Sequence, residues 1–402
     1  MEKQHIDDFA LFGGKQAFAS FRTTMNLVVP DRDIFFTYAK ESFAARHLTN
    51  HGPTMKELER QLAEFHGVRH CLTFCNCFTA MYIALRCLAL AGKREVVVPS
   101  LTYRRMADII DWAGLLPRFC DVDPETLGIS PATARPCINE NTALLLAPHP
   151  ITRLCDIDGM ERLAQEYGLP LFFDSVEACG GAHTDRMIGG FGDCESFSMH
   201  PSKVLNSCEG GYITTNNNDI AQTLKLARAY GFFGRDNIIM LGHNAKLNEL
   251  HAAMGLATLA GIERQFADNK RIHLAYQAHL SGLPGVTVIP YDHAEKRNWK
   301  SVLVRLDDAW PFSREETLQV LNAENIHARP YYSPPQHVSV PRQAGQGVHL
   351  MPVTDQAAAS HLILPFGSAV SEEDTAIVGQ VLRGMSVLRT PLKERLSSGA
   401  AS

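Results

Sequence analysis

The sequence predicts an α/β protein whose sheet is largely parallel and covered by helices on both faces. Between residues 55 and 173, short apolar runs alternate with segments of helical periodicity. The runs are almost continuously apolar, which is typical of strands buried on both faces. Beyond about residue 275 the pattern changes to short strands and proline-rich turns, as at Pro330 and Pro334-Pro335. This change, in a chain of 402 residues, indicates a second, smaller α+β lobe.

The alternation can be followed element by element. The pattern predicts helices over residues 55–65, 79–90, 103–112 and 157–167, and strands over residues 70–74, 95–98, 118–122, 143–147 and 169–173. In the second lobe it predicts a strand over residues 300–305. We expect an N-terminal arm at 1–45 that joins the small domain, a large domain at 46–275, a small C-terminal domain at 276–390 and a tail at 391–402.

Charge and hydropathy narrow the class of partner. The 38 basic and 43 acidic residues give a formal net charge of -5, and no long run of lysine and arginine occurs. Both features argue against a nucleic acid or an anionic membrane and favour a small-molecule ligand. No apolar stretch reaches the length of a membrane span, and the first residues resemble no signal peptide. We therefore expect a cytoplasmic protein.

The ten cysteines are scattered through apolar stretches, which is typical of buried free thiols. One cluster suggests zinc and comprises His66, His70, Cys71, Cys75 and Cys77. It lacks paired Cys-x-x-Cys spacing, and it spans a helix end and a strand whose alternate residues face opposite ways. We expect no metal there.

Two residues suggest chemistry. Asp174 closes the apolar run 169–173, and Lys203 follows in a loop. This order suits pyridoxal 5′-phosphate (PLP), because a lysine amine condenses with its aldehyde to a Schiff base and a carboxylate keeps its pyridine nitrogen protonated. Taken singly, the two residues are equally consistent with a capped turn and a solvated cation.

The surrounding residues resemble the DegT/DnrJ/EryC1/StrS family of PLP-dependent sugar aminotransferases. The matching motifs are Asp-Ser-Val-Glu-Ala at 174–178, Gly-Gly-Phe-Gly-Asp at 189–193, Phe-Ser-Met-His-Pro-Ser-Lys at 197–203 and Glu-Gly-Gly at 209–211. Further matches at 48–53, 99–103, 242–246 and 364–366 extend the resemblance to roughly residues 10–385. It implies a fold-type I PLP-dependent transferase with a mostly parallel seven-stranded sheet, working as a homodimer with shared active sites.

The resemblance also implies roles for individual residues. Lys203 would carry PLP and move the proton, Asp174 would pair with the pyridine nitrogen, and Tyr103 would stack on the ring. The phosphate would be held by Ser198, by the helix start at Asn76, Cys77, Phe78 and Thr79, and by Asn244 of the neighbouring subunit. Backbone amides at a helix start suit a phosphate on physical grounds as well.

The chain departs from the family at two cofactor positions. Cys77-Phe78 stands where the family has Gly-Thr or Ala-Thr, so a phosphate-binding hydroxyl is missing, and whether Thr79 compensates stays open. Glu177 replaces a Gln or His near the cofactor's phenolic oxygen. There, a carboxylate would either repel the phenolate or take up a proton.

Candidate substrate contacts are fewer. Arg104 and Arg105 follow Tyr103 where the family has small or apolar residues. If a helix begins there, Arg104 could offer a fork to a carboxylate or phosphate, whereas we expect Arg105 to face solvent. We add His200 and Tyr331 to the candidate substrate contacts.

The resemblance implies amino transfer from L-glutamate or a similar donor to a keto-sugar, commonly nucleotide-linked, in polysaccharide or antibiotic biosynthesis. The departures leave a keto-cyclitol or a sugar phosphate open as acceptor. A PLP-dependent sugar dehydratase is a further alternative, but such members have His in place of the lysine, so Lys203 argues against it. The missing Gly-Thr also leaves open a binding or regulatory protein that has lost catalysis.

Overall fold

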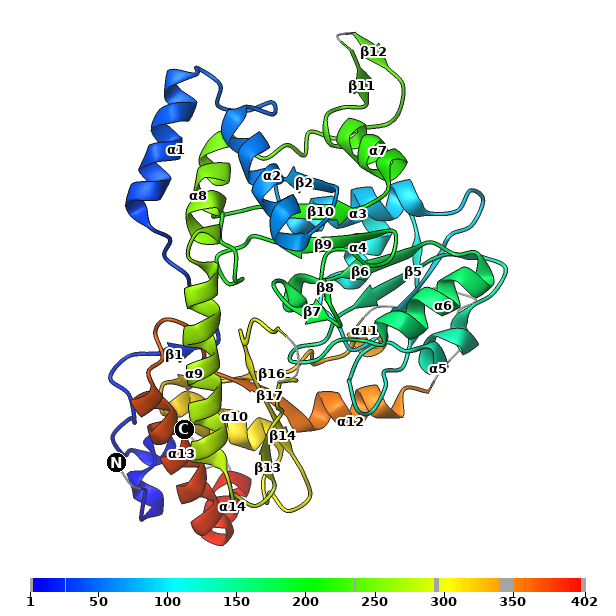
Figure 1. Ribbon diagram of the computed structural model, residues 1–402. Helices are drawn as coiled ribbons and strands as arrows, with labels where there is room; N and C mark the ends of the chain where they lie inside the picture. Colours follow the sequence, from blue (N-terminus) through cyan, green and yellow to red (C-terminus); the bar gives the residue numbers. More distant parts are fainter. Residues whose placement is uncertain (1–2, 26, 235, 293–295, 340–349, 399–402) are drawn as a thin grey trace.

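A seven-stranded sheet organises the larger of two lobes (Figure 1). The computed structural model describes residues 3–25, 27–234, 236–292, 296–339 and 350–398. In sheet order the strands are β2 (His70–Phe74), β10 (Gly211–Thr215), β9 (Cys194–Ser198), β6 (Leu171–Asp174), β5 (Thr142–Pro148), β3 (Glu95–Pro99) and β4 (Leu116–Cys120). The strands from β9 to β4 run parallel, and β10 is antiparallel to both its neighbours. The predicted mostly parallel sheet of seven strands is confirmed.

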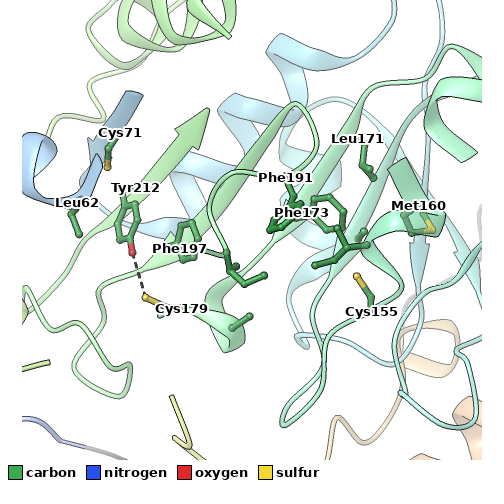
Figure 2. Close-up of a cluster of buried hydrophobic side chains, with 14 of the residues drawn as sticks. Leu62, Cys71, Cys155, Met160, Leu171, Phe173, Cys179, Phe191, Phe197 and Tyr212 are labelled. Carbon is green, nitrogen blue, oxygen red and sulfur yellow. Dashed lines mark hydrogen bonds between the residues drawn. The ribbon is translucent and has the colours of Figure 1, made fainter. Parts of the chain in front are cut away.

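Alternate residues of each strand enter two separate cores. Phe173 lies in the core beneath α2 (Pro53–His66), α6 (Ile157–Tyr167) and α8 (Glu249–Leu259), whereas Phe172 packs against the helices of the opposite face. Those helices are α3 (Cys77–Leu88), α4 (Met106–Trp112) and α7 (Asn218–Arg228). Figure 2 shows the first core, where Phe173, Phe197 and Tyr212 fill the space under the sheet. Because both faces are covered, the strands are continuous apolar runs in the sequence.

The smaller lobe is built on an antiparallel sheet. Its order is β13 (Val286–Val288), β14 (Val302–Leu306), β17 (His361–Leu364) and β16 (Arg329–Pro330). Helix α9 (Ile262–Leu280) follows α8 into this lobe, where α10 (Arg314–Ala323) and α13 (Glu372–Val387) lie around the sheet (Figure 1).

The N-terminal segment packs into the smaller lobe. Phe9 and Phe18 are buried in its core, and β1 (Arg22–Thr23) pairs in parallel with β15 (Ile326–His327). Helix α1 (Arg32–Ala44) then crosses to the larger lobe and packs on α8. The chain therefore begins and ends in the same lobe (Figure 1).

The remaining elements are short. The strands are β7 (Ala182–His183), β8 (Arg186–Met187), β11 (Phe232–Phe233) and β12 (Asn237–Ile238). The helices are α5 (Pro131–Ala134), α11 (Gln336–Ser339), α12 (Pro352–Ser360) and α14 (Arg389–Ser397), with 3-10 turns at Ile6–Asp8, Ala10–Phe12, Arg135–Cys137 and Val176–Ala178. Among the described residues, no helix is both long and apolar enough to cross a bilayer.

Several observed elements begin or end a few residues from their predicted ranges, and two of the differences have clear local causes. Helix α4 begins at Met106 rather than at residue 103, because Arg105 caps it in a non-helical conformation (φ -107°, ψ 15°). The segment predicted as a tail from residue 391 is helical up to Ser397, and Leu392 is fully buried in the core of the smaller lobe. Burial of that side chain explains why this stretch is ordered.

Candidate active site

Strand register brings the predicted cofactor residues to one edge of the large sheet. Gly211, the first residue of β10, pairs with Phe74 on one side and with Ser198 on the other. Asp174, the last residue of β6, pairs with Ser196 of the neighbouring β9. The carboxyl ends of β2, β9 and β6 therefore meet, and such an edge is where open α/β sheets bind ligands.

The glycine at 211 lets the start of α3 approach this edge closely. A Cβ at Gly211 would lie 2.5 Å from both the backbone nitrogen and the Cα of Cys77. No side chain fits at that distance, so the last glycine of the Glu-Gly-Gly motif is required by packing. The contact holds the amino end of α3 over the sheet edge.

Glu177 lies between two lysines at this edge. Its Oε1 accepts a hydrogen bond from Lys203 Nζ at 2.8 Å, and its Oε2 accepts one from Lys300 Nζ at 2.7 Å. All three side chains are largely buried. Glu177 belongs to the short turn after β6, Lys203 to the loop after β9, and Lys300 to the smaller lobe.

These contacts set the charges of the group. Burial alone would raise the pKa of Glu177, but Lys203 and Lys300 together hold that pKa well below its usual range. Burial opposes the charge of Lys203, yet Glu177 raises its pKa above the ordinary value. For Lys300, burial together with the charge of Lys203 outweighs Glu177, and the pKa is lowered. Glu177 is therefore ionised between the two lysine amines.

Asp174 is buried with few partners. Its Oδ1 accepts a long hydrogen bond, 3.3 Å, from the amide of Val176. Burial raises the pKa of Asp174 to about 6, although the Val176 amide and Lys203 both lower it. A buried carboxylate so weakly bonded has capacity for a cationic donor.

A second buried acid supports the turn that carries Asp174. Glu195 accepts hydrogen bonds from the amides of Gly189 and Phe191, both at 2.7 Å, and from the Ser175 hydroxyl. The glycine-rich motif at 189–193 thus wraps around a carboxylate on β9. Through Glu195, the motif is connected to Ser175, the residue after Asp174. The sequence analysis did not assign this supporting role to the motif.

Residues 298–300 of the smaller lobe place Lys300 beside Glu177. The Asn298 side chain donates to the backbone carbonyls of Glu177 and Cys179, each at 2.9 Å. Trp299 then takes a left-handed conformation (φ 55°) immediately before Lys300. Sequence reasoning missed Lys300 because it belongs to another lobe and to no motif around Lys203.

The amino end of α3 offers free amides. The Asn76 side chain accepts a hydrogen bond from the Thr79 amide at 2.8 Å and so caps the helix. Within the described part of the chain, the amides of Cys77 and Phe78 donate to no acceptor. Asn76 and Thr79 are therefore engaged with each other, and the two amides between them remain for a ligand.

Two tyrosines flank the lysine. Tyr103 is half exposed, and burial raises its pKa while the charge of Lys203 lowers it. Tyr332 has its pKa raised by burial and then by Glu177, so it too lies near the group. Its φ of 39° is strained for a residue other than glycine.

Tyr331 is fully buried in a cluster with Leu101, Ile151 and Leu303. Its ring centroid lies 4.5 Å from that of Tyr332. Burial raises the pKa of both tyrosines, and the charge of Glu177 adds to both shifts. Sequence reasoning named Tyr331 as a candidate substrate contact and missed Tyr332.

The other candidate residues contact neither Glu177 nor the amines of Lys203 and Lys300 among the described residues, although the His200 carbonyl accepts a hydrogen bond from the Lys203 amide at 2.8 Å. Arg104 is exposed ahead of α4, and Arg105 pairs with Asp108 on the surface. His200 Nδ1 contacts the Ser202 hydroxyl at 2.9 Å, and the Ser198 hydroxyl accepts from the His200 amide at 3.3 Å.

Asn244 and His66, a member of the histidine–cysteine cluster, form hydrogen bonds within the chain. Asn244 is exposed and accepts a hydrogen bond from Lys246 at 2.6 Å. His66 uses both ring nitrogens, toward the Ile188 carbonyl and the Tyr212 hydroxyl. Within the described ranges, no three His, Cys, Asp or Glu side chains are grouped to hold a metal.

Comparison with known proteins agrees with this geometry. A profile of the DegT/DnrJ/EryC1/StrS aminotransferase family matches residues 31–383. The structure of DesI in the presence of its TDP-sugar product superposes with a TM-score of 0.92 at 33% identity, covering 98% of this chain and 100% of that one. GDP-perosamine synthase of Caulobacter vibrioides is 28% identical over 84% of this chain and 91% of its own length. L-glutamine:2-deoxy-scyllo-inosose aminotransferase of Streptomyces fradiae is 31% identical over 57% and 56%.

Proposed function

The chain belongs to the DegT/DnrJ/EryC1/StrS aminotransferase family, a PLP-dependent family, and from this premise we propose that it transfers an amino group to a nucleotide-linked keto-sugar. The observation that carries the proposal is the buried group formed by Lys203, Glu177 and Asp174 at the ligand edge of the sheet. The names of the similar proteins support the choice of acceptor.

The residues present fit PLP. Asp174 is a buried carboxylate with a raised pKa and one long hydrogen bond, which suits a protonated ring nitrogen. The free amides of Cys77 and Phe78, with the Ser198 hydroxyl, would hold the phosphate, and Tyr103 would cover the ring. Lys203 would hold the cofactor covalently. When bound, PLP supplies an electron sink that stabilises negative charge beside the transferred nitrogen.

Lys203 would move the proton. To accept a proton from the carbon of the amino donor, its Nζ must be neutral, and Glu177 works against that by raising its pKa. Lys300 offsets this effect, because it holds the other oxygen of Glu177. When Lys203 gives up its charge, Glu177 still has a cation beside it, and no uncompensated buried carboxylate is left.

The proposed donor is L-glutamate, and the proposed acceptor is a keto-sugar carried on a nucleoside diphosphate. DesI was crystallised in the presence of its TDP-sugar product, and the Caulobacter relative makes a GDP-sugar. A keto-cyclitol is the second candidate, since one relative at 31% identity is named for such a substrate.

The two half-reactions can be tested separately. PLP-loaded protein is mixed with L-glutamate or, in a parallel sample, with L-glutamine, and both the absorbance of the bound cofactor and the release of the 2-oxo acid are followed. The aminated form is then offered TDP- and GDP-linked keto-sugars and, in a second arm, a keto-cyclitol. Bleaching with stoichiometric 2-oxoglutarate and reversal by one acceptor support the proposal. A cofactor unaffected by glutamate or glutamine would point to a binding or regulatory protein, and loss of water from the sugar would point to a dehydratase.

We also propose a homodimer with shared active sites. The hairpin β11–β12 projects from the larger lobe (Figure 1), and it and the residues after it expose large apolar side chains. These are Phe233, Ile238, Ile239 and Leu241, each more than half exposed. Such a patch is typical of a surface covered by another molecule. Asn244 follows directly, so covering the hairpin would bring it close to a second subunit.

Subunit mixing tests this arrangement. Lys203→Ala and Asn244→Ala proteins, each impaired alone, are mixed under conditions where subunits exchange. Hybrid dimers with one site free of both lesions should recover activity. Demonstrated exchange without recovery would rule out sharing while leaving the amino transfer itself untouched.

A further inference from the structure

A cavity of about 290 Å³ lies between the two lobes, away from the lysine cluster. Its walls combine the loops at residues 124–127 and 151–153 of the larger lobe with β14 and α12 of the smaller lobe. The size is close to the lower end of small-ligand pockets. Nothing in the amino transfer described above uses this space.

The cavity has an apolar wall and a basic rim. Ile151 and Leu303 line it from the two lobes and belong to one buried cluster. Arg153 and Arg305 contribute guanidinium groups from opposite lobes, against a single acid, Glu125. With the histidine of the lining neutral, the charges sum to about one positive unit.

The two arginines have no carboxylate partner in the described part of the chain. Among the described residues, Arg153 Nε is also buried without an acceptor. Thr152 also lines the cavity, is only 3% exposed, and its hydroxyl has no hydrogen-bond partner. Its φ of 74° is strained for threonine. Buried polar groups without partners are uncommon in folded proteins, and two of those in the described residues, Arg153 Nε and the Thr152 hydroxyl, belong to residues that line this cavity.

His361 adds a neutral imidazole to the same wall. It pairs across the sheet with Arg305, so both side chains lie on one face. Burial lowers the pKa of His361 to about 4, and the nearby arginines contribute to this shift. The imidazole therefore brings no charge at neutral pH, and the arginines supply the positive field.

We propose that this cavity binds a small organic anion, with its phosphate or carboxylate held between Arg153 and Arg305 and its apolar part against Ile151 and Leu303. Guanidinium groups are suited to both headgroups through paired hydrogen bonds. Because the two arginines belong to different lobes, the bound anion ties the lobes together.

Two short paths join the cavity to the active site. The loop that carries Ile151 and Arg153 starts at His149, whose amide donates to the backbone carbonyl of Asp174 at 2.9 Å. On the other side, Tyr331 packs with Ile151 and Leu303 and contacts Tyr332 beside Glu177. An anion in the cavity is thus placed to act as an effector of the neighbouring site.

Calorimetric titration of PLP-saturated protein tests the proposal. The probes are phenyl phosphate and benzoate, with phenol as the neutral control, and saturating PLP keeps the cofactor's own phosphate site occupied. We expect one anion bound per chain, no binding of phenol, and an increase in Tm on binding. Arg153→Met and Arg305→Met should each weaken the affinity by about tenfold or more, since each removes a charged hydrogen-bonding partner.

Arg264→Met is the matched control, because Arg264 is an exposed arginine on α9 outside the cavity. It should bind the anions like the unaltered protein. Circular dichroism and retained PLP show that each variant is folded, and Arg305→Met alone suffices if the other is unstable. The proposal is overturned if neither anion saturates at millimolar concentration, or if binding persists unchanged in both cavity variants. The latter result would place the anion in the active site.

Discussion

Glu177 and Glu324 are both buried carboxylates paired with buried lysines, yet they are held very differently. Glu324, in the smaller lobe, accepts hydrogen bonds from the amides of Ala10 and Ala17, both at 2.8 Å, as well as from Lys3. Lys3 in turn donates to two backbone carbonyls. Every group in this pair is fixed by the backbone around it.

At the active site the bonding is sparse. Within the described residues, the side chains of Lys203 and Lys300 donate to Glu177 alone. In this part of the described structure neither amine donates to a backbone carbonyl, so neither is fixed in the way that Lys3 is. The comparison teaches that the ion pair with a structural role has further hydrogen bonds to the backbone. In the ion pair proposed to take part in the reaction, the lysine amines donate only to the carboxylate among the described residues.

The largest effect on catalysis should come from Lys203→Ala. Removing the amine that would move the proton should reduce turnover by at least about a thousandfold. Steady-state amino transfer measures it, with Lys296→Ala, a surface lysine paired with Glu263, as the control. If the variant kept a tenth of the activity or more, Lys203 would not be the catalytic base.

The structural pair should respond through stability instead. Glu324→Gln leaves Lys3 charged and uncompensated in the core, which costs about 3 to 5 kcal/mol. We expect a much lower Tm in thermal unfolding, with unchanged turnover per folded molecule. Glu263→Gln, at an exposed pair, should change stability by less than about 1 kcal/mol. Equal Tm values for the two variants would mean that the Lys3–Glu324 pair stabilises the fold no more than an exposed ion pair does.

Asp174→Asn should keep PLP bound but slow the reaction. The amide cannot balance a protonated ring nitrogen, and losing a buried charge partner costs roughly 2 to 5 kcal/mol, which corresponds to about thirtyfold or more in rate. Cofactor affinity and the glutamate half-reaction are measured on the same sample. Near-normal half-reaction rates would show that Asp174 has another role.

Two substitutions should move the pH profile in opposite directions. Glu177 raises the pKa of Lys203, so Glu177→Gln should lower the midpoint of the spectral titration of bound PLP. Lys300→Met removes a competing cation from the same carboxylate, so the midpoint should rise. Glu263→Gln again serves as the control. Shifts of the same sign would mean that the two lysines do not share Glu177.

The smallest effect should be that of Phe78→Thr. A hydroxyl at the start of α3 adds one hydrogen bond to the cofactor phosphate, which should tighten PLP binding by about tenfold. The reaction type should not change. Equilibrium dialysis of PLP against both proteins measures the ratio, and an unchanged affinity would indicate that the phosphate is held elsewhere.

Local sequence patterns predicted much of the fold and part of the candidate site. Strand β2 and helix α6 match their predicted ranges, because apolar periodicity over a buried element is set by the element itself. Asp174 and Lys203 could be identified as a pair from their spacing and motifs. What the sequence could not supply was Lys300, since its place beside Glu177 depends on how the smaller lobe meets the larger one.

One further difference has a local cause that composition does not reveal. The late start of α4 leaves Arg104 exposed, because Arg105 is not helical. A single backbone conformation here outweighs the pattern of side chains.

The central claim is that Lys203, rather than the lysine sharing its carboxylate, carries the cofactor. PLP-loaded protein is reduced with borohydride and digested, and the modified peptide is identified by mass spectrometry. The structure predicts one label per chain, on the peptide that contains Lys203, and the same label position in Lys300→Met protein. A label on Lys300, or on any other lysine in the unaltered protein, would contradict the account.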